Sequence, residues 1–154
     1  MDEFTPTLPG PRVEWLKEVP LKVLCFIWRA KWGRIPSAQA LEGRGVQVPS
    51  IICGYCLNGV ESADHILIQC KFAVIVRNWI MNWCGINSGD IDNLDTLLHS
   101  VANWSQCTKK RRILTLIYYG MIWSIWKARN ERIFNQVKRS PTQVMDDIQE
   151  LVLY

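Results

Sequence analysis

Residues 53–70 read CGYCLNGVESADHILIQC, in which three cysteines and one histidine follow the spacing C-x2-C-x8-H-x4-C. The four residues are Cys53, Cys56, His65 and Cys70. They are the ligand types of a tetrahedral structural zinc site, and a two-residue gap lets both sulfurs of a tight turn point at one ion. We expect Gly54 to leave room for that turn, because it carries no Cβ. Four protein ligands would leave no open position for water or substrate, so the stretch predicts one structural Zn²⁺ rather than a catalytic one.

The sequence leaves other uses of these thiols open. Cysteine commonly packs as a small buried hydrophobe, and two cysteines separated by two residues can act as a redox pair. The flanking strand and helix of a thioredoxin-like unit are missing from the pattern. Cys56 and His65 could serve as a nucleophile and its base, but no third orienting group or oxyanion donor is identifiable. We therefore do not expect an enzyme.

The two later ligands are expected near the start of a helix. Residues 61–64 have the composition of a helix start, with Ser62 or Asp64 near the cap. Beyond Cys70, five apolar residues recur at the spacing of one helical face. These residues are Phe72, Val76, Trp79, Ile80 and Trp83. A metal at this point would pin the helix to the preceding loop.

Helical patterns also cover the rest of the chain. Residues 21–32 are apolar around most of the helix circumference, which is typical of the central helix of a bundle. A short helix is expected after Ser37, an amphipathic helix over residues 90–104 and a long basic helix over residues 109–134. The last helix would bury Val144, Ile148 and Leu151. No alternation typical of strands is persuasive, so the predicted fold class is all-α: a small helical bundle with one structural zinc knuckle of the Cys3His type.

Length and composition favour a compact globular chain, since 49% of its 154 residues are hydrophobic and 21% are charged. We expect a disordered leader over residues 1–14, a zinc-binding helical module over 15–86, and a C-terminal helical extension over 87–154 that packs on it. No secretory signal opens the chain, and the longest apolar run, residues 113–126, is too short to span a bilayer. We therefore expect an intracellular location, in the nucleus or the cytoplasm, where metal binding is favoured over disulfides. The remaining cysteines, expected to pack or to have no role, are Cys25, Cys84 and Cys107.

Positive charge is concentrated in two blocks of the sequence. Residues 105–139 contain nine Lys or Arg and one acidic residue, and residues 20–50 contain five and one. One candidate phosphate-binding set is Lys109, Lys110, Arg111 and Arg112. Such a run can neutralise phosphates, but it can equally be a solvated helix start or a nuclear localisation signal; cations oppose the dipole at a helix N-terminus, which favours a functional role. The second set, expected to form a rim around the zinc knuckle, is Arg29, Lys31, Arg34 and Arg44.

The eight tryptophans offer aromatic surface for nucleic-acid bases or for a protein partner. Three pairs have helical spacing and are expected mainly in the core. These pairs are Trp28 and Trp32, Trp79 and Trp83, and Trp123 and Trp126. Trp32 is the exception, because Lys31 and Arg34 beside it could hold the backbone of a nucleic acid whose base stacks on the indole.

Several of these residues together resemble one family. They are the segments 19–23, 26–29 and 34–36, with Leu41, Arg44, Gly45, the four candidate ligands, Glu61, Phe72 and Ala73. Residues 15–86 are similar to the zinc-binding domain that follows the polymerase in LINE-type, or non-LTR, retrotransposon reverse transcriptases of plants. Residues 122–134 are similar to the segment after that domain. Arg77 is a departure, since relatives often carry tryptophan there.

The resemblance implies a nucleic-acid-binding appendage of a reverse transcriptase, with Zn²⁺ as its cofactor and with RNA or single strands favoured over duplex DNA. Polymerase activity is not carried over, because the paired aspartates of a polymerase site are missing from the sequence. The competing hypothesis is a protein-interaction module, a domesticated retroelement fragment whose tryptophan-rich apolar surfaces, once covered by the polymerase, bind a host protein or a second copy of the chain. A polymerase domain is a further candidate partner. No membrane partner is expected. Added salt should weaken phosphate binding steeply and an apolar interface hardly at all.

Overall fold

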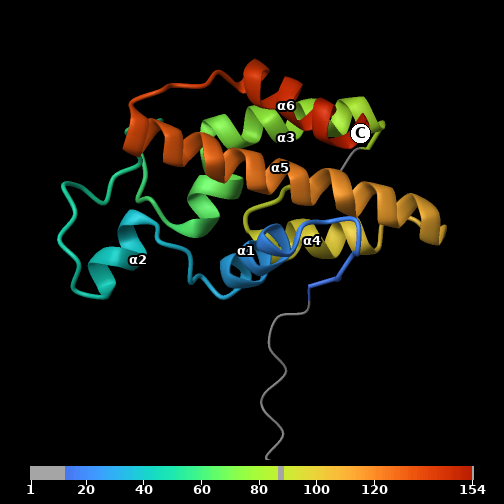
Figure 1. Ribbon diagram of the computed structural model, residues 1–154, viewed down its shortest axis with the longest axis horizontal. Coiled ribbons are helices and arrows are strands. Elements are labelled where there is room, and N and C mark those ends of the chain that lie inside the picture. Colours follow the sequence, from blue (N-terminus) through green and yellow to red (C-terminus); the bar gives the residue numbers. More distant parts are fainter. Residues whose placement is uncertain (1–12, 87–88, 154) are drawn as a thin grey trace, which may run out of the picture.

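The computed structural model describes residues 13–86 and 89–153, and this part of the chain is largely helical (Figure 1). In chain order the elements are α1 (Leu21–Lys31), α2 (Ala38–Gly43), the π-helical segment η1 (His65–Gln69), α3 (Lys71–Cys84), α4 (Leu94–Ala102), α5 (Thr108–Asn135) and α6 (Pro141–Leu153). The single extended pairing among the described residues is an isolated antiparallel bridge between Ile52 and Val60. The predicted all-α class is confirmed.

The longest helix, α5, is the centre of the fold. Figure 1 shows it crossing the molecule with α1 and α4 on one side and α3 and α6 on the other, and it contacts all four helices and η1. Twelve of its 28 residues are buried, among them Ile117, Met121 and Ile125. A helix that is covered from several sides must be apolar around most of its circumference, which explains the long apolar run over residues 113–126.

The central position was predicted instead for the helix over residues 21–32, and that prediction is wrong. One face of α1 packs on α5, where the ring of Phe26 stacks on Trp126 with 5.3 Å between the ring centroids. Another face is open to solvent, so that Leu21 is 64% exposed and Trp28 is 41% exposed. The sequence shows apolar residues around most of α1, but within the described residues only part of that circumference is covered.

On α3 the buried face is rotated away from the predicted one. Phe72, Val76 and Ile80 are buried as predicted, but Trp79 and Trp83 are 45% and 43% exposed. The other buried residues of this helix are Ala73, Arg77 and Met81. α3 contacts α5, α6 and η1, and both tryptophans lie at the edge of the core that these elements form.

The other core predictions are largely confirmed. Trp126 is buried and Trp123 packs against the core. In α6, Ile148 is fully buried, whereas Leu151 is 57% exposed because the buried face turns toward Met145. Among the residues that the structure describes, no helix is both long and apolar enough to cross a membrane.

The predicted leader falls mainly on residues 1–12, which lie outside the described residues. From residue 13 onward the chain packs on α5: the Tyr119 hydroxyl donates to the carbonyl of Glu14 at 3.0 Å, and Leu16 is 4% exposed. One hydrophobic core joins segments from both sides of the boundary expected at residue 87. The division into two units stays a prediction.

Candidate functional site

The first two cysteines lie in a tight turn that backbone hydrogen bonds close. The N–H of Cys53 donates to the carbonyl of Gly59 at 2.7 Å, and the N–H of Leu57 donates to the carbonyl of Cys53 at 2.9 Å. Leu57 adopts a left-handed conformation with φ of 58°, and its side chain is 76% exposed. The turn therefore holds Cys53 and Cys56 close together while the bulky residue after them points outward.

The other two ligands lie at the two ends of the π-helical turn. Ser62 Oγ accepts the N–H of His65 at 3.0 Å, so Ser62 is the cap that the sequence suggests. Asp64, the alternative cap, instead accepts the N–H of Leu94 at 3.0 Å and ties this turn to the start of α4. The N–H of Cys70 donates to the carbonyl of His65 at 2.7 Å, which is the i to i+5 bond of a π-helix. This wide turn brings the two ligands to the same side.

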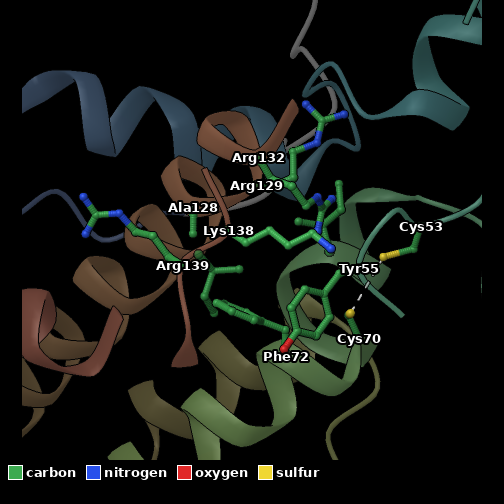
Figure 2. Close-up of a pocket in the computed structure, with 11 residues that line it drawn as sticks. Cys53, Tyr55, Cys70, Phe72, Ala128, Arg129, Arg132, Lys138 and Arg139 are labelled. Carbon is green, nitrogen blue, oxygen red and sulfur yellow. Dashed lines mark hydrogen bonds between the residues drawn. The ribbon is translucent and has the colours of Figure 1, made fainter. Parts of the chain in front are cut away.

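The four side chains converge on one point. Their donor atoms all lie within 4.8 Å of one another. The sulfurs of Cys53 and Cys70 face each other 3.8 Å apart (Figure 2), and Cys56 Sγ is 3.3 Å from His65 Nε2. Zinc bonds of about 2.3 Å to sulfur and about 2.0 Å to nitrogen place two tetrahedral sulfurs roughly 3.8 Å apart, and a sulfur and a nitrogen roughly 3.5 Å apart. The residues therefore fit one tetrahedral ion, and thiolates with imidazole are ligands that zinc favours.

The contact between Cys53 and Cys70 gives the two thiols opposite titration behaviour. A hydrogen bond from Cys70 lowers the pKa of Cys53 to about 4 against the effect of burial, and the backbone N–H groups of Cys56 and Tyr55 act in the same direction. That hydrogen bond, together with burial, raises the pKa of Cys70. Two thiolates at 3.8 Å would repel each other, and a bound cation removes that repulsion. The electrostatics of the cluster therefore favour a metal ion.

Gly59 is the glycine that this site requires. A Cβ at this position would lie 2.7 Å from Cε1 and 3.0 Å from Nδ1 of His65, so the imidazole would have to move. For Gly54 the prediction is wrong, because a Cβ there would be 3.7 Å from the Arg132 guanidinium, an ordinary contact. The tight approach occurs where the loop returns past the histidine ring, and ligand spacing alone does not reveal it.

A buried carboxylate joins the metal loop to two helices. Glu61 is 2% exposed, and its Oε1 accepts from Arg129 Nη2 at 2.5 Å and from the N–H of Ala38 at 3.0 Å. Its Oε2 lies 3.6 Å from Arg132 Nη2, and its backbone N–H donates to the carbonyl of Ile51 at 2.7 Å. Glu61 thus links the loop to the start of α2 and the last turns of α5. In the sequence Glu61 was noted as part of the expected helix start at residues 61–64 and of the family resemblance, and neither indicated a buried ion pair.

Four cations from α5 and the loop after it are among the residues that line the cavity beside the cysteines. Figure 2 shows them as Arg129, Arg132, Lys138 and Arg139. Arg139 lies 2.6 Å from both Glu131 and Asp147, while the first two arginines pair with Glu61. Three of these four cations therefore offset carboxylates. Their signal in the sequence was the charge density of residues 105–139, but nothing there indicated which cations would reach the metal loop.

The predicted rim consisted of Arg29, Lys31, Arg34 and Arg44. Lys31 points to α4, where its Nζ is 3.9 Å from the Asp95 carboxylate and its side chain is 11% exposed. The guanidinium of Arg34 lies 5.5 Å from the ring centre of Trp32, which is 41% exposed. Arg29 donates to the carbonyl of Arg34 at 3.5 Å, and Arg44 is exposed at the end of α2. Lys31 is thus paired with a carboxylate of α4, and the rim of these cations around the zinc knuckle stays a prediction.

The basic run at the start of α5 is only partly available. Arg112 forms an ion pair with Glu18, and Arg111 donates to the hydroxyl of Thr108 at 3.5 Å. Lys109 and Lys110 are exposed, and neither forms an ion pair with another residue in the described ranges 13–86 and 89–153.

A cleft of about 360 Å³ lies beside this run, and we call it the tryptophan cleft. Its lining is Trp83, Cys84, Trp104, Lys110, Ile113, Leu114 and Ile117. Trp83 is 43% exposed, Trp104 is 42% exposed and Ile113 is 46% exposed. Trp83 was predicted to lie in the core, and no role was predicted for Trp104. The signal that could have indicated the cleft was the nearness of Trp104 to the four consecutive cations.

Arg77, the departure from the family pattern, is a buried structural cation. It is 7% exposed, and its Nη1 donates to the carbonyl of Ile68 at 2.6 Å. Burial lowers its pKa. Because that carbonyl belongs to η1, Arg77 steadies the segment between His65 and Cys70.

A Cys3His donor set, held by a turn and a π-helical segment within an all-α bundle, defines a small helical metal-binding module. Residues 7–79 match the family described as zinc-binding in reverse transcriptase. This match includes all four candidate ligands and Glu61, and it supports a zinc-binding domain of that kind in the first half of the chain. α4, α5 and α6 lie beyond the matched residues. No curated protein and no solved structure is similar enough to the chain to count as a match.

Proposed function

We propose that this chain is a zinc-stabilised module that binds RNA or single-stranded nucleic acid and derives from a LINE-type retrotransposon reverse transcriptase of a plant. The family match supports the zinc and the reverse transcriptase origin. The donor set supports one structural Zn²⁺ held by Cys53, Cys56, His65 and Cys70, which leaves no open coordination position. The proposal assigns no polymerase step or other catalytic step to these residues.

The observation that carries the nucleic-acid proposal is the tryptophan cleft beside Lys109 and Lys110. Two exposed ammonium groups without a carboxylate partner among the described residues can contact phosphates and release counterions. Trp83 and Trp104 present indole surface within the same cleft that Lys110 lines. Proteins that bind single strands stack unpaired bases on exposed aromatic rings and hold the phosphate backbone with neighbouring cations.

The position at the start of α5 adds to this attraction. The first turn contains no acidic residue, so the positive end of the dipole of a 28-residue helix is not offset there. Lysine cations at this end cost helix stability, and phosphate binding would remove that cost. The arrangement suits a backbone-directed contact with little reading of base sequence.

Metal analysis tests the zinc part of the proposal. Protein purified without added metal should contain one zinc per chain, and Cys70→Ser should lose it while Cys25→Ser, which changes an exposed cysteine, should retain it. A wild-type chain without zinc, or a Cys70→Ser chain with full zinc content, contradicts the proposal.

Binding of a fluorescent single-stranded RNA at several salt concentrations tests the nucleic-acid part. Lys109→Ala combined with Lys110→Ala should flatten the slope of log affinity against log salt by about 1.4, since each phosphate contact on a single strand contributes about 0.7. Trp104→Leu should weaken binding by about 1–3 kcal/mol through lost stacking. Lys127→Ala, which removes an exposed cation elsewhere on α5, is the matched control and should leave the slope unchanged.

Trp32 is the other candidate for stacking on a base, and Trp32→Leu tests it in the same assay. A loss of affinity in Trp32→Leu but not in Trp104→Leu would move the binding surface to the end of α1. An RNA affinity that does not change with salt concentration would contradict the proposal. So would a salt slope that stays the same after the double lysine change.

A further inference from the structure

A second hollow lies near the opposite end of α5 from the tryptophan cleft. It is a groove of about 700 Å³ between α1, α2, the loop that carries Ile52 and the last turns of α5, and we call it the interhelical groove. Its apolar lining includes Phe26, Ile35, Leu41, Ile52, Trp123 and Phe134. Clefts of roughly 300–1,000 Å³ are large enough to bury a compact ligand, so this groove can accept several apolar side chains.

The lip of the groove is apolar and open. Phe134 is 70% exposed, Ile52 is 44% exposed and Ile133 is 39% exposed. These side chains come from two segments far apart in the sequence, yet all three line the same hollow. A contiguous exposed apolar surface of this kind is typical of an interaction site rather than of scattered surface residues.

The charges around the groove have one sign. Lys22 and Arg29 on α1 are exposed at the lining, whereas Arg132, which reaches it from α5, pairs with Glu61. Among the described residues that line it, Glu61 is the one acidic side chain, and Arg129 offsets its charge within the core. The accessible charges are therefore positive, and they complement an acidic partner.

The aromatic rings of the groove are already engaged with protein groups. The Lys22 ammonium lies 5.9 Å from the ring centre of Trp123, and Phe26 packs edge-on against the same indole at 5.5 Å. Trp126 stacks on Phe26, and the Arg129 guanidinium lies 4.9 Å from its ring centre. Because stacking on a base needs a free ring face, the groove is better suited to aliphatic and aromatic side chains than to nucleic-acid bases.

We propose that the interhelical groove docks an acidic peptide segment of a protein partner. The segment inserts large apolar side chains between α1 and the last turns of α5, and its carboxylates contact Lys22 and Arg29. This interaction is separate from nucleic-acid binding, because Phe134 and Lys110 lie roughly 35 Å apart along α5. One chain can therefore hold a nucleic acid at one end of α5 and a protein at the other.

Selection from a library of random 16-residue peptides displayed on phage, with the zinc-loaded full chain as bait, tests this proposal. The enriched peptides should carry net negative charge and at least two large apolar residues. Their synthetic forms should bind the wild-type chain. Phe134→Ser and Lys22→Glu should each weaken their binding about tenfold or more, as expected where a few contacts supply most of the binding energy. Leu151→Ser is the matched control, since it removes an exposed apolar side chain from α6, and it should leave peptide affinity unchanged.

Three results would overturn the proposal. They are a selection that enriches no sequence, a set of enriched peptides without acidic character, and peptides whose affinity is the same for Phe134→Ser as for the wild type. The same variants are measured with single-stranded RNA, so that failure of this proposal and failure of the nucleic-acid proposal are separate outcomes. Loss of RNA affinity in Phe134→Ser would place nucleic acid in the groove and would also overturn it.

Discussion

The two ends of α5 both carry several cations, but the cations are used differently. At the C-terminal end, Arg129 and Arg132 lie against the buried carboxylate of Glu61 beside the candidate metal ligands. At the N-terminal end, Lys109 and Lys110 are exposed and lie beside a cleft lined by tryptophans. The sequence shows both groups as basic clusters of the same helix.

The difference is set by the acidic residues that the fold brings to each end. Glu61 comes from the metal loop, 68 residues before Arg129 in sequence, and the ion pair fixes the loop on α5. At the other end Glu18 reaches Arg112, while the two lysines before it keep their charge open to solvent. Nearness to the metal loop therefore indicates structural cations here, and the distant end is the better candidate for phosphate contacts.

Among the changes that test this difference between the two ends of α5, loss of a metal ligand should have the largest effect on stability. In Cys53→Ser, we expect the zinc to be lost and the free energy of unfolding to fall by roughly 5 kcal/mol or more, since structural zinc contributes about 10–16 kcal/mol in zinc-finger peptides. Hydrogen exchange should show that η1 and the start of α3 lose protection before the middle of α5. Cys25→Ser, at an exposed position, is the control. If Cys53→Ser had the same urea unfolding curve as the wild type, no bound metal would stabilise the C-terminal end of α5.

Removal of the buried charge at Glu61 should have the next largest effect. Glu61→Gln leaves the guanidinium of Arg129 in the core without its counter-charge, and breaking a buried pair in this way costs about 3–5 kcal/mol. The matched change, Glu131→Gln, removes a partly exposed partner of Arg139 and should cost about 0–1 kcal/mol. Urea unfolding of both variants with zinc in excess measures the two costs. Equal values would show that the arginines at this end are not structural.

Much of the fold follows from local patterns in the sequence, because helix periodicity and ligand spacing are properties of short segments. The all-α class and the helices now called α1 to α6 were predicted on that basis, and the Cys3His cluster predicted from spacing forms in the structure. The central helix was not predicted correctly, since α1 and α5 both have long apolar runs. Which of them is covered on more sides depends on how the other helices pack.

Most of the contacts in the site that sequence reasoning missed are long-range. Glu61 meets Arg129, Asp64 meets Leu94, and Gly59 lies against the ring of His65. Of these contacts only the last is local, and a ring approaching a backbone position leaves no periodic pattern. Trp83 was misplaced for a similar reason, because the direction of the buried face of α3 depends on the position of α6.

Gly59→Ala tests the close approach to the histidine and should have a smaller effect than the buried charge. Its Cβ would lie 2.7 Å from His65 Cε1, so the imidazole must shift away from its place near Cys56. Changes that disturb the groups supporting a metal ligand typically cost 10–100-fold in affinity, and we expect zinc affinity to fall by about that factor in a competition with a chelator. Gly54→Ala places its Cβ at an ordinary distance of 3.7 Å from Arg132 and is the control. If Gly54→Ala weakened zinc binding more than Gly59→Ala, the turn would be the strained element and the histidine ring would not.

The smallest effect concerns Cys107, which reports the local charge at the open end of α5. Hydrogen bonds from the backbone N–H groups of Lys110 and Lys109, together with the two lysine charges, lower the pKa of this exposed thiol. A lowered pKa means more thiolate at a given pH, so iodoacetamide should modify Cys107 half-maximally at a pH below the value of about 8.5 for a free cysteine. Cys84, whose pKa is raised by burial, should react only at higher pH.

Mass spectrometry of alkylated peptides over a pH series measures both profiles in one sample. Lys109→Ala combined with Lys110→Ala should move the Cys107 profile to higher pH, because two positive charges that lower its pKa are lost while the backbone hydrogen bonds remain. Lys127→Ala, farther along α5, should leave the profile in place. Bound single-stranded RNA should slow alkylation of Cys107, since phosphates on the two lysines would both cover the thiol and raise its pKa. If the pH dependence of Cys107 alkylation did not change in the double lysine variant, this end of the helix would have no concentrated positive charge. The two ends of α5 would then differ only in the tryptophans.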